Sequence, residues 1–368
     1  MRWARLRSLL HRGVATGIFP GAVAWVRVNG ETVFRAEAGY AQVLPEPRPV
    51  RPDTLFDVAS LTKVLCTVPV VLRLCGRGLL HLDDPLSSRL PDLEGTFWRG
   101  VSLRQALAHT TGLPAWRPLY LHTRGKPRDT VVAAVAVVSP EGPPGRRVVY
   151  SDLGILLAGL AAERVTGQRT DALFSEHVAG PLRLRHTRFC PPPAWRTRCA
   201  ATEQGNRYER ELAGEAGAGF PWRDGVIVGE VHDGNAYYAL GGVAPHAGLF
   251  STAEEVARVS EAWLDGSGWI PETLVVEARS DQRRGAQGEP RGLGWVLHHP
   301  QAFFSAFGPA SFGHTGFTGT SVAVDPDRRV VAVLLTNRVH PHVREGIEEF
   351  RAEFYRAVAS EVFLRRGA

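Results

Sequence analysis

The chain has 368 residues, of which 44% are hydrophobic and 22% are charged, and these values are ordinary for a soluble globular protein with a sizeable core. Its net charge of +6 does not indicate a nucleic-acid partner, because the arginines are scattered and no dense basic run accompanies them. Residues 1–10 hold no apolar run long enough for a signal peptide, and no segment is long enough for a membrane span. We therefore expect a cytoplasmic protein with no nucleic-acid partner and no membrane span.

The four cysteines favour a reduced protein. They lack Cys-x-x-Cys spacing, and four in a chain of this length do not indicate a disulfide framework. A bridge between Cys190 and Cys199 stays open as an alternative. The histidines lack the helical pair with a later carboxylate that is typical of zinc enzymes, so we expect no metal and no other cofactor.

The first part of the chain predicts a helix, a hairpin and a second helix. Residues 2–17 have helical character, and two alternating apolar runs, Ala22–Val28 and Thr32–Ala38, flank Asn29-Gly30. Asn-Gly between such runs is a strong hairpin signal. A buried helix is expected from Ser60 to about Gly76.

The middle of the chain is predicted to be mostly helical. Helical patterns recur at residues 103–108, 131–138, 153–166 and 171–178. Residues 183–233 are rich in Pro, Arg, Gly and Glu without clean periodicity, so we expect irregular surface loops there. These loops and residues 120–128 are expected to shape the substrate pocket, although they carry no readable code.

The last part of the chain predicts one helix, three strands and a closing helix. The helices are expected at residues 253–264 and 343–364, and the strands at Gly292–Leu297, Thr320–Asp325 and Val330–Thr336. Strands at both ends around a helical middle indicate an α+β fold, with one antiparallel sheet flanked by terminal helices and an inserted all-helical lobe. We expect a single domain over 1–368. Residues 1–59 and about 240–368 would form the α/β lobe and about 60–239 the helical lobe, with a cleft at the seam.

The motif Ser60-Leu61-Thr62-Lys63 is the first candidate for chemistry. Lys63 and Lys126 are the only lysines in a chain that otherwise uses arginine. A lysine amine can be brought to a pKa at which it accepts a proton, whereas arginine stays charged. Residues three apart on a helix share a face, so the Lys63 amine can reach the Ser60 hydroxyl, and serine needs such a partner to become nucleophilic.

Two further segments are expected beside Ser60. Tyr150-Ser151-Asp152 directly precedes a predicted helix, and His314-Thr315-Gly316 precedes a predicted strand, with glycines that permit close approach of a ligand to the backbone. The turn at 109–114 is expected to be fixed by His109. His232 and Asn235 are candidates for lining the cleft. We interpret the other histidines as structural or cleft-lining.

In this order, the three motifs resemble those of the serine beta-lactamase and penicillin-binding-protein superfamily, in particular its class C-like branch with carboxylesterases and D-amino-acid peptidases. The resemblance implies that Ser60 is the acyl-accepting nucleophile, Lys63 its proton partner and Tyr150 a second proton-transfer group. It also implies an oxyanion hole formed by the backbone N–H groups of Ser60 and Phe317. Ser151-Asp152 also matches part of a motif of class A enzymes, but we favour Tyr150 over Ser151 as the second catalytic group.

Two departures from this superfamily bear on function. Asp152 stands where an asparagine is usual, and it is expected to hold Lys63 by charge, which raises the pKa of the lysine and shifts proton transfer toward Tyr150. His314 stands where a lysine is usual, so the constant cation for a substrate carboxylate is absent. Asp152, His314, Thr315 and Gly316 are the candidate substrate-binding residues.

The sequence therefore predicts a cofactor-independent serine hydrolase that forms an acyl-enzyme at Ser60 on a small ester or peptide substrate. A carboxylesterase or D-stereospecific peptidase activity is favoured over a beta-lactamase activity. The alternative is a penicillin- or muropeptide-binding sensor in which Asp152 and His314 prevent deacylation. Substrate identity and oligomeric state are left open.

Overall fold

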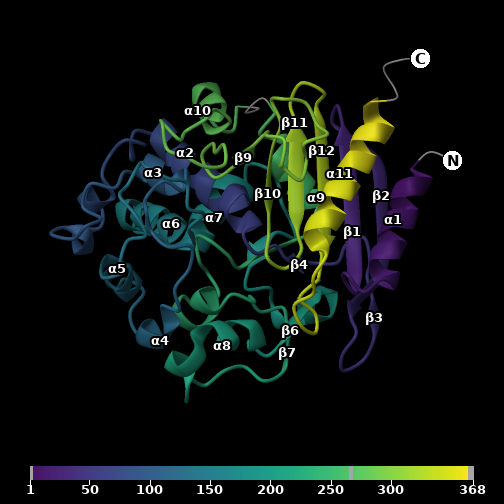
Figure 1. Cartoon of the computed structure of the whole chain (residues 1–368), viewed down its shortest axis with the longest axis horizontal. Helices are drawn as coiled ribbons and strands as arrows, with labels where there is room; N and C mark the ends of the chain where they lie inside the picture. Colours follow the sequence, from purple (N-terminus) through teal and green to yellow (C-terminus); the bar gives the residue numbers. More distant parts are fainter. Residues whose placement is uncertain (1–2, 265–267, 364–368) are drawn as a thin grey trace.

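The computed structural model describes residues 3–264 and 268–363 (Figure 1). Its central feature is a seven-stranded antiparallel sheet in the order β3-β2-β1-β12-β11-β10-β9. The strands are β1 (Gly21–Val28), β2 (Glu31–Gln42), β3 (Arg48–Pro49), β9 (Val296–Leu297), β10 (Phe312–Thr315), β11 (Ser321–Asp325) and β12 (Val330–Thr336). The two ends of the chain therefore meet in one sheet, as the strand pattern predicted.

The contact between β1 and β12 joins the two ends of the chain, with Ala22 opposite Thr336 and Val28 opposite Val330. Alternate residues of β1 face two different cores, because successive side chains of a strand point to opposite faces. Ala24 packs into the core under the terminal helices, whereas Val23 and Trp25 pack into the larger core on the other side. Apolar burial on both faces fixes the register of this central strand.

Helices cover both faces of the sheet. The helices α1 (Ala4–Ala15) and α11 (Ile347–Phe363) lie together on one face, and Figure 1 shows them in purple and yellow at one side of the molecule. The opposite face packs against α9 (Ala253–Glu261), which contacts β1, β11 and β12. The arrangement confirms the expected α+β class with flanking terminal helices.

The helical part is organised around α6. Ten consecutive residues of this helix, Leu153 to Ala162, are buried, as expected for a helix that is apolar on all sides. The expected helix after Ser60 consists of a π-helical turn at Lys63–Thr67 followed directly by α2. The helices of this part are α2 (Val68–Gly76), α3 (Leu103–Leu107), α4 (Tyr120–Thr123), α5 (Thr130–Ala136), α6 (Asp152–Thr166) and α7 (Thr170–Phe174).

The expectation of irregular loops over residues 183–233 was wrong. This region contains helix α8 (Arg207–Ala213), a two-stranded sheet of β6 (Ala201–Gln204) and β7 (Val226–Val228), and β5 (Arg188–Phe189), which pairs in a second small sheet with β8 (Leu249–Ser251) and, through it, β4 (Phe56–Asp57). Elements this short do not complete enough periods for hydrophobic periodicity to reveal them. They have their own small core, which includes Cys199, Val228 and Phe250.

Smaller differences concern the last third of the chain. The strand expected over Gly292–Leu297 is confined to β9, because Gly294 has a φ of +78°, which interrupts extended backbone. Helix α10 (Glu272–Ala278) was not expected, and α11 begins at Ile347 rather than at residue 343. The predicted end of that helix at Leu364 lies outside the described residues. All four cysteines are free, so the alternative of a Cys190–Cys199 bridge was wrong.

Gly159 allows α6 to pack closely against the segment that carries His246. A Cβ atom at Gly159 would lie 2.3 Å from the Pro245 ring, which real Cβ atoms do not approach so closely. We therefore expect Gly159→Ala to destabilise the protein by about 1–3 kcal/mol through overpacking, although alanine favours helix by about 1 kcal/mol. The measurement is equilibrium denaturation in urea.

Gly154 offers a matched control on the same helix, since a Cβ there would meet its nearest neighbour at 3.4 Å, an ordinary contact. Gly154→Ala should leave the free energy of unfolding unchanged or raise it. Equal effects of the two substitutions would contradict the packing argument.

Candidate active site

Ser60 lies at the start of the helical part, directly after β4. The residue before it, Ala59, has a φ of +48°, a conformation that non-glycine residues rarely adopt. Asp57 holds this turn, because its Oδ1 accepts a hydrogen bond from the Ala59 N–H and its Oδ2 accepts one from the His232 N–H, at 2.9 and 2.8 Å. The strained backbone therefore presents Ser60 in one fixed orientation.

Lys63 is one helical turn after Ser60, and its Nζ donates to the Ser60 Oγ at 2.7 Å. The contact between Lys63 and Ser60 that helical spacing predicted is thus present. The lysine is fully buried, and its Nζ also lies 2.7 Å from the Asp152 Oδ1 and donates to the His246 carbonyl at 3.1 Å. Burial lowers the pKa of Lys63, but the charges and hydrogen bonds of Asp152 and Tyr150 outweigh it, and the net pKa is raised. Lys63 is therefore an ammonium at neutral pH.

Tyr150 lies against the same ammonium, with the Lys63 Nζ 5.1 Å from the centre of its ring. The ring packs between two histidines, His109 at 4.6 Å and His314 at 5.8 Å between ring centres. The neighbouring Ser151 is fully engaged elsewhere, because its Oγ donates to the Pro114 carbonyl and caps α6 by accepting from the Gly154 N–H. Tyr150, rather than Ser151, is thus the hydroxyl that adjoins Lys63.

Both histidines beside Tyr150 are neutral. Burial, together with the positive charges of Lys63 and Arg291, lowers the pKa of His109 and of His314 well below the usual value. The His109 Nδ1 accepts a hydrogen bond from the Ser151 N–H at 3.0 Å and so fixes the turn as expected. The His314 Nδ1 lies 2.7 Å from the Thr315 carbonyl, which accepts only, and this nitrogen therefore carries the proton.

The turn after β10 brings Phe317 next to Ser60. Thr318 and Thr320 donate their hydroxyls to the carbonyls of Asp57 and Val58, at 2.8 and 2.9 Å. Arg351 of α11 reaches under the turn, and its Nη2 donates to the carbonyls of Gly316 and Thr320, at 2.8 and 2.9 Å. Burial lowers the pKa of this guanidinium to about 10. The C-terminal helix therefore helps to position the backbone opposite the serine.

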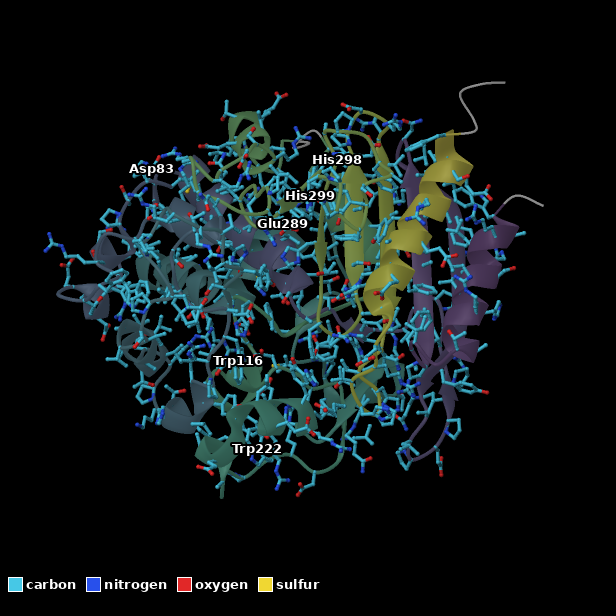
Figure 2. All side chains as sticks on the ribbon, viewed as in Figure 1. Asp83, Trp116, Trp222, Glu289, His298 and His299 are labelled. Atoms are coloured by element: carbon cyan, nitrogen blue, oxygen red, sulfur yellow. The ribbon has the colours of Figure 1, made fainter. Side chains whose placement is uncertain are left out.

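A cavity of about 390 Å³ adjoins Ser60 and extends toward Asp233. Its walls comprise acidic, aromatic, apolar and histidine side chains from both parts of the fold: Asp57, Ala59, Ser60, Ala115, Trp116, Tyr150, Asp152, Tyr208, Glu209, Leu212, His232, Asp233, His246, Ala247 and Phe317. A larger open groove of about 990 Å³ lies on the other side of α8 and is lined by Trp222 among others. Figure 2 separates the two by their labelled tryptophans, Trp116 at the cavity and Trp222 near the lower edge.

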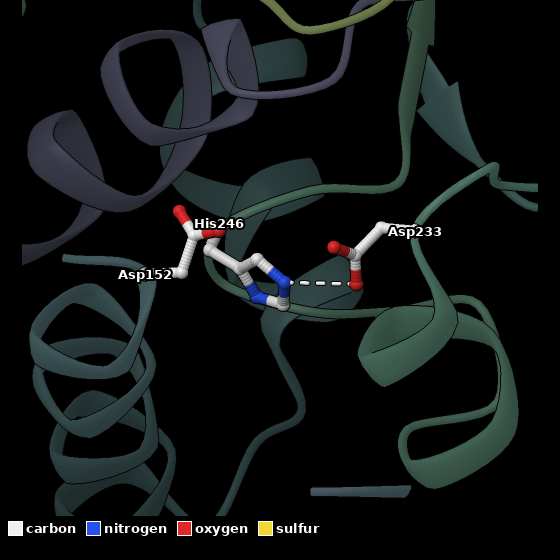
Figure 3. A group of neighbouring side chains, drawn as sticks. All are labelled: Asp152, Asp233 and His246. Atoms are coloured by element: carbon white, nitrogen blue, oxygen red, sulfur yellow. Dashed lines mark hydrogen bonds and ion pairs between the residues drawn. The ribbon is translucent and has the colours of Figure 1, made fainter. Parts of the chain in front are cut away.

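Asp233 and His246 form a second ionisable pair in this cavity. The His246 Nε2 lies 3.0 Å from the Asp233 Oδ1, and Figure 3 shows the imidazole between the carboxylates of Asp152 and Asp233. Burial raises the pKa of Asp233, but His246 and the Ala236 N–H stabilise the anion and bring the pKa down to about 2. Asp233 therefore carries a negative charge at neutral pH.

Three comparisons with known proteins identify the family of the chain. A family model described as Beta-lactamase matches residues 6–356. The N-acetylmuramyl-L-alanine amidase of Bacillus subtilis (strain 168) is 30% identical, over 98% of this chain and 88% of its own. A putative D-alanyl-D-alanine carboxypeptidase of Salmonella schwarzengrund (strain CVM19633) is also 30% identical, over 92% of this chain and 83% of its own.

The chain belongs to the beta-lactamase family. Among solved structures, a penicillin-binding protein homologue from Caulobacter crescentus has the same fold, with a TM-score of 0.75 at 23% identity over 98% of this chain and 97% of its own. The family resemblance carried by the three motifs is thus confirmed, and it places the protein among the hydrolases. No helix within residues 3–264 and 268–363 is long and apolar enough to cross a membrane.

The sequence-predicted residues of this beta-lactamase-family protein fall into two groups. Ser60, Tyr150, Asp152 and Phe317 line one cavity, and Lys63 contacts Ser60 and Asp152 beside it. His314, Thr315 and Gly316 lie on β10 and its turn and are not among the residues that line the cavity, so their contact with substrate stays a prediction.

The cleft-lining candidates also divide. His232 lines the cavity and stacks on Phe317, with 5.6 Å between ring centres. Asn235 is instead a structural residue that donates to the Arg117 carbonyl and accepts from the Tyr120 N–H. Asp233, Glu209 and Trp116 are cavity residues to which sequence reasoning assigned no role. The sequence feature that could have pointed to Asp233 was its position between the two cleft-lining candidates His232 and Asn235.

Asp152, Asp233 and His246 offer atoms within 4.8 Å of one another, a spacing compatible with a metal ion. However, the Lys63 ammonium already lies 2.7 Å from the Asp152 Oδ1 and supplies positive charge at that position. A divalent ion would have to share one carboxylate with a buried ammonium. These residues therefore fit a metal poorly, and no step of the chemistry is derived through one.

Arg351 should be important for both stability and activity. Arg351→Met keeps much of the apolar length but removes one of the two donors to each of the buried carbonyls of Gly316 and Thr320, which keep only their backbone N–H partners. The loss of these charge-assisted hydrogen bonds should cost about 1.5–3 kcal/mol in the free energy of unfolding. Hydrolysis should fall as well, since Phe317 lies in this turn. The measurements are thermal denaturation and turnover of a nitrophenyl ester, with Arg356→Met, an exposed position on the same helix, as the control.

Proposed function

We propose that the protein hydrolyses an amide or ester bond in a small molecule through an acyl-enzyme at Ser60. The observation that carries this proposal is the 2.7 Å contact between the Lys63 Nζ and the Ser60 Oγ on the wall of a cavity of about 390 Å³. A serine hydroxyl with an adjacent proton-transfer group is the arrangement that nucleophilic catalysis requires. Membership of a hydrolase family supports the same reading.

The ion pair with Asp152 assigns Lys63 an electrostatic role. Because the pKa of Lys63 is raised, its ammonium stabilises negative charge on the Ser60 Oγ instead of removing the proton. Tyr150 then takes up the Ser60 proton on its phenolic oxygen when Oγ attacks the carbonyl carbon, a step that requires this oxygen to have lost its own proton beforehand. The resulting phenol returns the proton to the leaving nitrogen or oxygen as the bond to the carbonyl carbon breaks. Water later attacks the acyl-enzyme with the same group as base.

The negative charge on the attacked carbonyl oxygen would be stabilised by the backbone N–H groups of Ser60 and Phe317. Two hydroxyl contacts hold the segment of Phe317 against residues 57 and 58, which supports this pairing. One such donor is typically worth about 2.7–4 kcal/mol in the transition state. A preorganised pair of this kind needs no side-chain movement during the reaction.

We favour amides over esters as the substrates because the two relatives named above are both named for amide cleavage, one as an amidase and the other as a putative carboxypeptidase. An efficient beta-lactamase activity is not part of the proposal. His314 stands where a lysine is usual, and the low pKa of this buried imidazole leaves it uncharged toward a substrate carboxylate. The cavity wall, moreover, contains no arginine or lysine among the residues that the structure describes.

The first test concerns the nucleophile. Ser60→Ala should reduce hydrolysis of a nitrophenyl ester by about a thousandfold or more, because no other group replaces the attacking oxygen. It should also abolish the mass increase that a fluorophosphonate produces on the wild-type protein. Full activity of this variant would refute the assignment, whereas a stable wild-type acyl adduct without product release would favour a binding protein.

The second test concerns the proton transfer. Asp152→Asn removes the negative charge that raises the pKa of Lys63, so burial should then lower that pKa. If the ammonium is required, activity of the variant should decline toward alkaline pH from a lower pH than in the wild type. The measurement is the pH dependence of kcat/KM for a nitrophenyl ester. A gain of activity near neutral pH would instead identify the free amine of Lys63 as the base.

A further inference from the structure

The cavity beside Ser60 is acidic. Four carboxyl side chains, Asp57, Asp152, Glu209 and Asp233, lie on its wall. The ammonium of Lys63 is fully buried behind Asp152 and does not belong to the wall. A substrate that fills this cavity therefore meets acceptors rather than cations.

Two of the four carboxyl groups form hydrogen bonds within the protein. Both oxygens of Asp57 accept backbone hydrogen bonds in the turn before Ser60, and burial raises its pKa. Glu209 accepts from the Gly234 N–H at 2.7 Å, and burial together with the charge of Asp233 raises its pKa well above the usual value. Glu209 is thus shifted toward its protonated, uncharged form. Asp152 and Asp233 are left as the groups that can receive a ligand.

Asp152 and Asp233 each have one oxygen in use and one oxygen available. The Asp152 Oδ1 contacts Lys63, and the Asp233 Oδ1 accepts from the Ala236 N–H and from the His246 Nε2. No hydrogen bond between described residues occupies the Oδ2 of either carboxylate. Both side chains are partly exposed to the cavity, at 16% and 19%.

His246 adds a third unused acceptor to the same place. Its Nε2 faces a carboxylate, which only accepts, so Nε2 carries a proton, and in the tautomer with a single proton Nδ1 is an acceptor. The residue is 1% exposed and lines the cavity, and its Nδ1 has no hydrogen-bond partner within the described part of the chain. A buried acceptor without a donor is costly unless a ligand supplies the donor.

The spacing of these three side chains suits one ammonium group. One carboxylate oxygen each of Asp152 and Asp233 and one ring nitrogen of His246 lie within 4.8 Å of one another, whereas two charge-assisted hydrogen bonds to a common nitrogen span up to about 5.6 Å. An ammonium has three donors, which matches the three acceptors. With a singly protonated His246, one added positive charge brings the net charge of Asp152, Asp233 and Lys63 to zero, whereas a divalent ion would leave a net positive charge.

The ammonium position lies close to the nucleophile. The Ser60 Oγ and the Asp152 Oδ1 are each 2.7 Å from the Lys63 Nζ, so the two oxygens are separated by no more than twice that distance. In an aminoacyl group, the α-amino nitrogen is two bonds from the carbonyl carbon that Ser60 would attack. The amine of a bound aminoacyl substrate thus comes within reach of Asp152.

We propose that the substrate carries a protonated α-amine on its acyl side, held between Asp152 and Asp233, so that the enzyme acts on aminoacyl amides or esters with a free amino group. Asp233 is the specificity-determining residue, and His246 positions it. This inference rests on the proposed acyl-enzyme chemistry at Ser60. It narrows that chemistry to substrates that bring a cation and no carboxylate to the cavity.

The kinetic test compares L- and D-alanine p-nitroanilide with their N-acetyl derivatives. At neutral pH we expect kcat/KM for the better free-amine enantiomer to exceed that of its acetylated form at least tenfold. The advantage should shrink above about pH 8, where an α-amine loses its proton. Asp233→Asn, which keeps the shape and an acceptor for His246, should reduce the free-amine to N-acetyl ratio at least tenfold.

Asp224→Asn is the matched control, because it removes the same charge from the groove on the other side of α8 and should leave the ratio unchanged. Equal rates for free and acetylated substrates, or a preference for the acetylated form, would overturn the proposal. If Asp233→Asn does not fold, as judged by thermal denaturation, the comparison of substrates on the wild type decides alone.

A binding measurement separates this proposal from the proposed function. Calorimetry with the Ser60→Ala variant compares alaninamide with N-acetylalaninamide and requires no turnover. Binding of the free amine at least tenfold more tightly, lost in the Ser60→Ala, Asp233→Asn double variant, supports the ammonium site even if the wild type hydrolyses nothing. Equal or tighter binding of the acetylated compound overturns the site even if Ser60 hydrolyses a nitrophenyl ester.

Discussion

The ammonium of Lys63 is the interaction on which the rest of the site depends. It is fully buried, and it contacts a serine hydroxyl, a carboxylate and a main-chain carbonyl from three separate segments of the chain. An ammonium without these partners would not remain charged in the interior, because burial favours the neutral amine. The partners in turn are positioned by the fold. Asp152 begins α6, and His246 follows the proline that packs on Gly159 of the same helix.

This single buried charge also determines the state of its neighbours. His109 and His314 flank Tyr150 within the field of Lys63 and Arg291, and these positive charges add to burial in lowering the pKa of both imidazoles. The histidine that replaces the usual lysine at position 314 is therefore neutral because it is buried and because a cation is already present nearby. Two buried cations so close together would repel each other without a second carboxylate to separate them.

Local features of the site followed from the sequence, and long-range ones did not. The Ser60–Lys63 contact is a matter of helical spacing, and the meeting of the two chain ends in one sheet follows from strand patterns at both ends. The pairing of Asp233 with His246 depends on how a π-helical turn and the loop after it fold back, and no periodicity encodes that. Likewise, Arg351 reaches the turn at Gly316 from the opposite end of the C-terminal region. The charge state of His314 required burial, which is a property of the packed molecule.

The two departures from the usual family motifs are physically coupled. Asp152 in place of the usual asparagine adds a negative charge beside Lys63. His314 in place of the usual lysine removes a positive charge from the other side of Tyr150. Together they make the site more negative by two charges than the usual arrangement, while each buried group still has a partner. A site altered in this direction binds carboxylate-bearing molecules less well and cationic ones better, since the Coulomb energy changes sign with the ligand. The free acceptors of Asp152, Asp233 and His246 line the same cavity as the serine, so the negative charge added at Asp152 acts on a ligand that binds there.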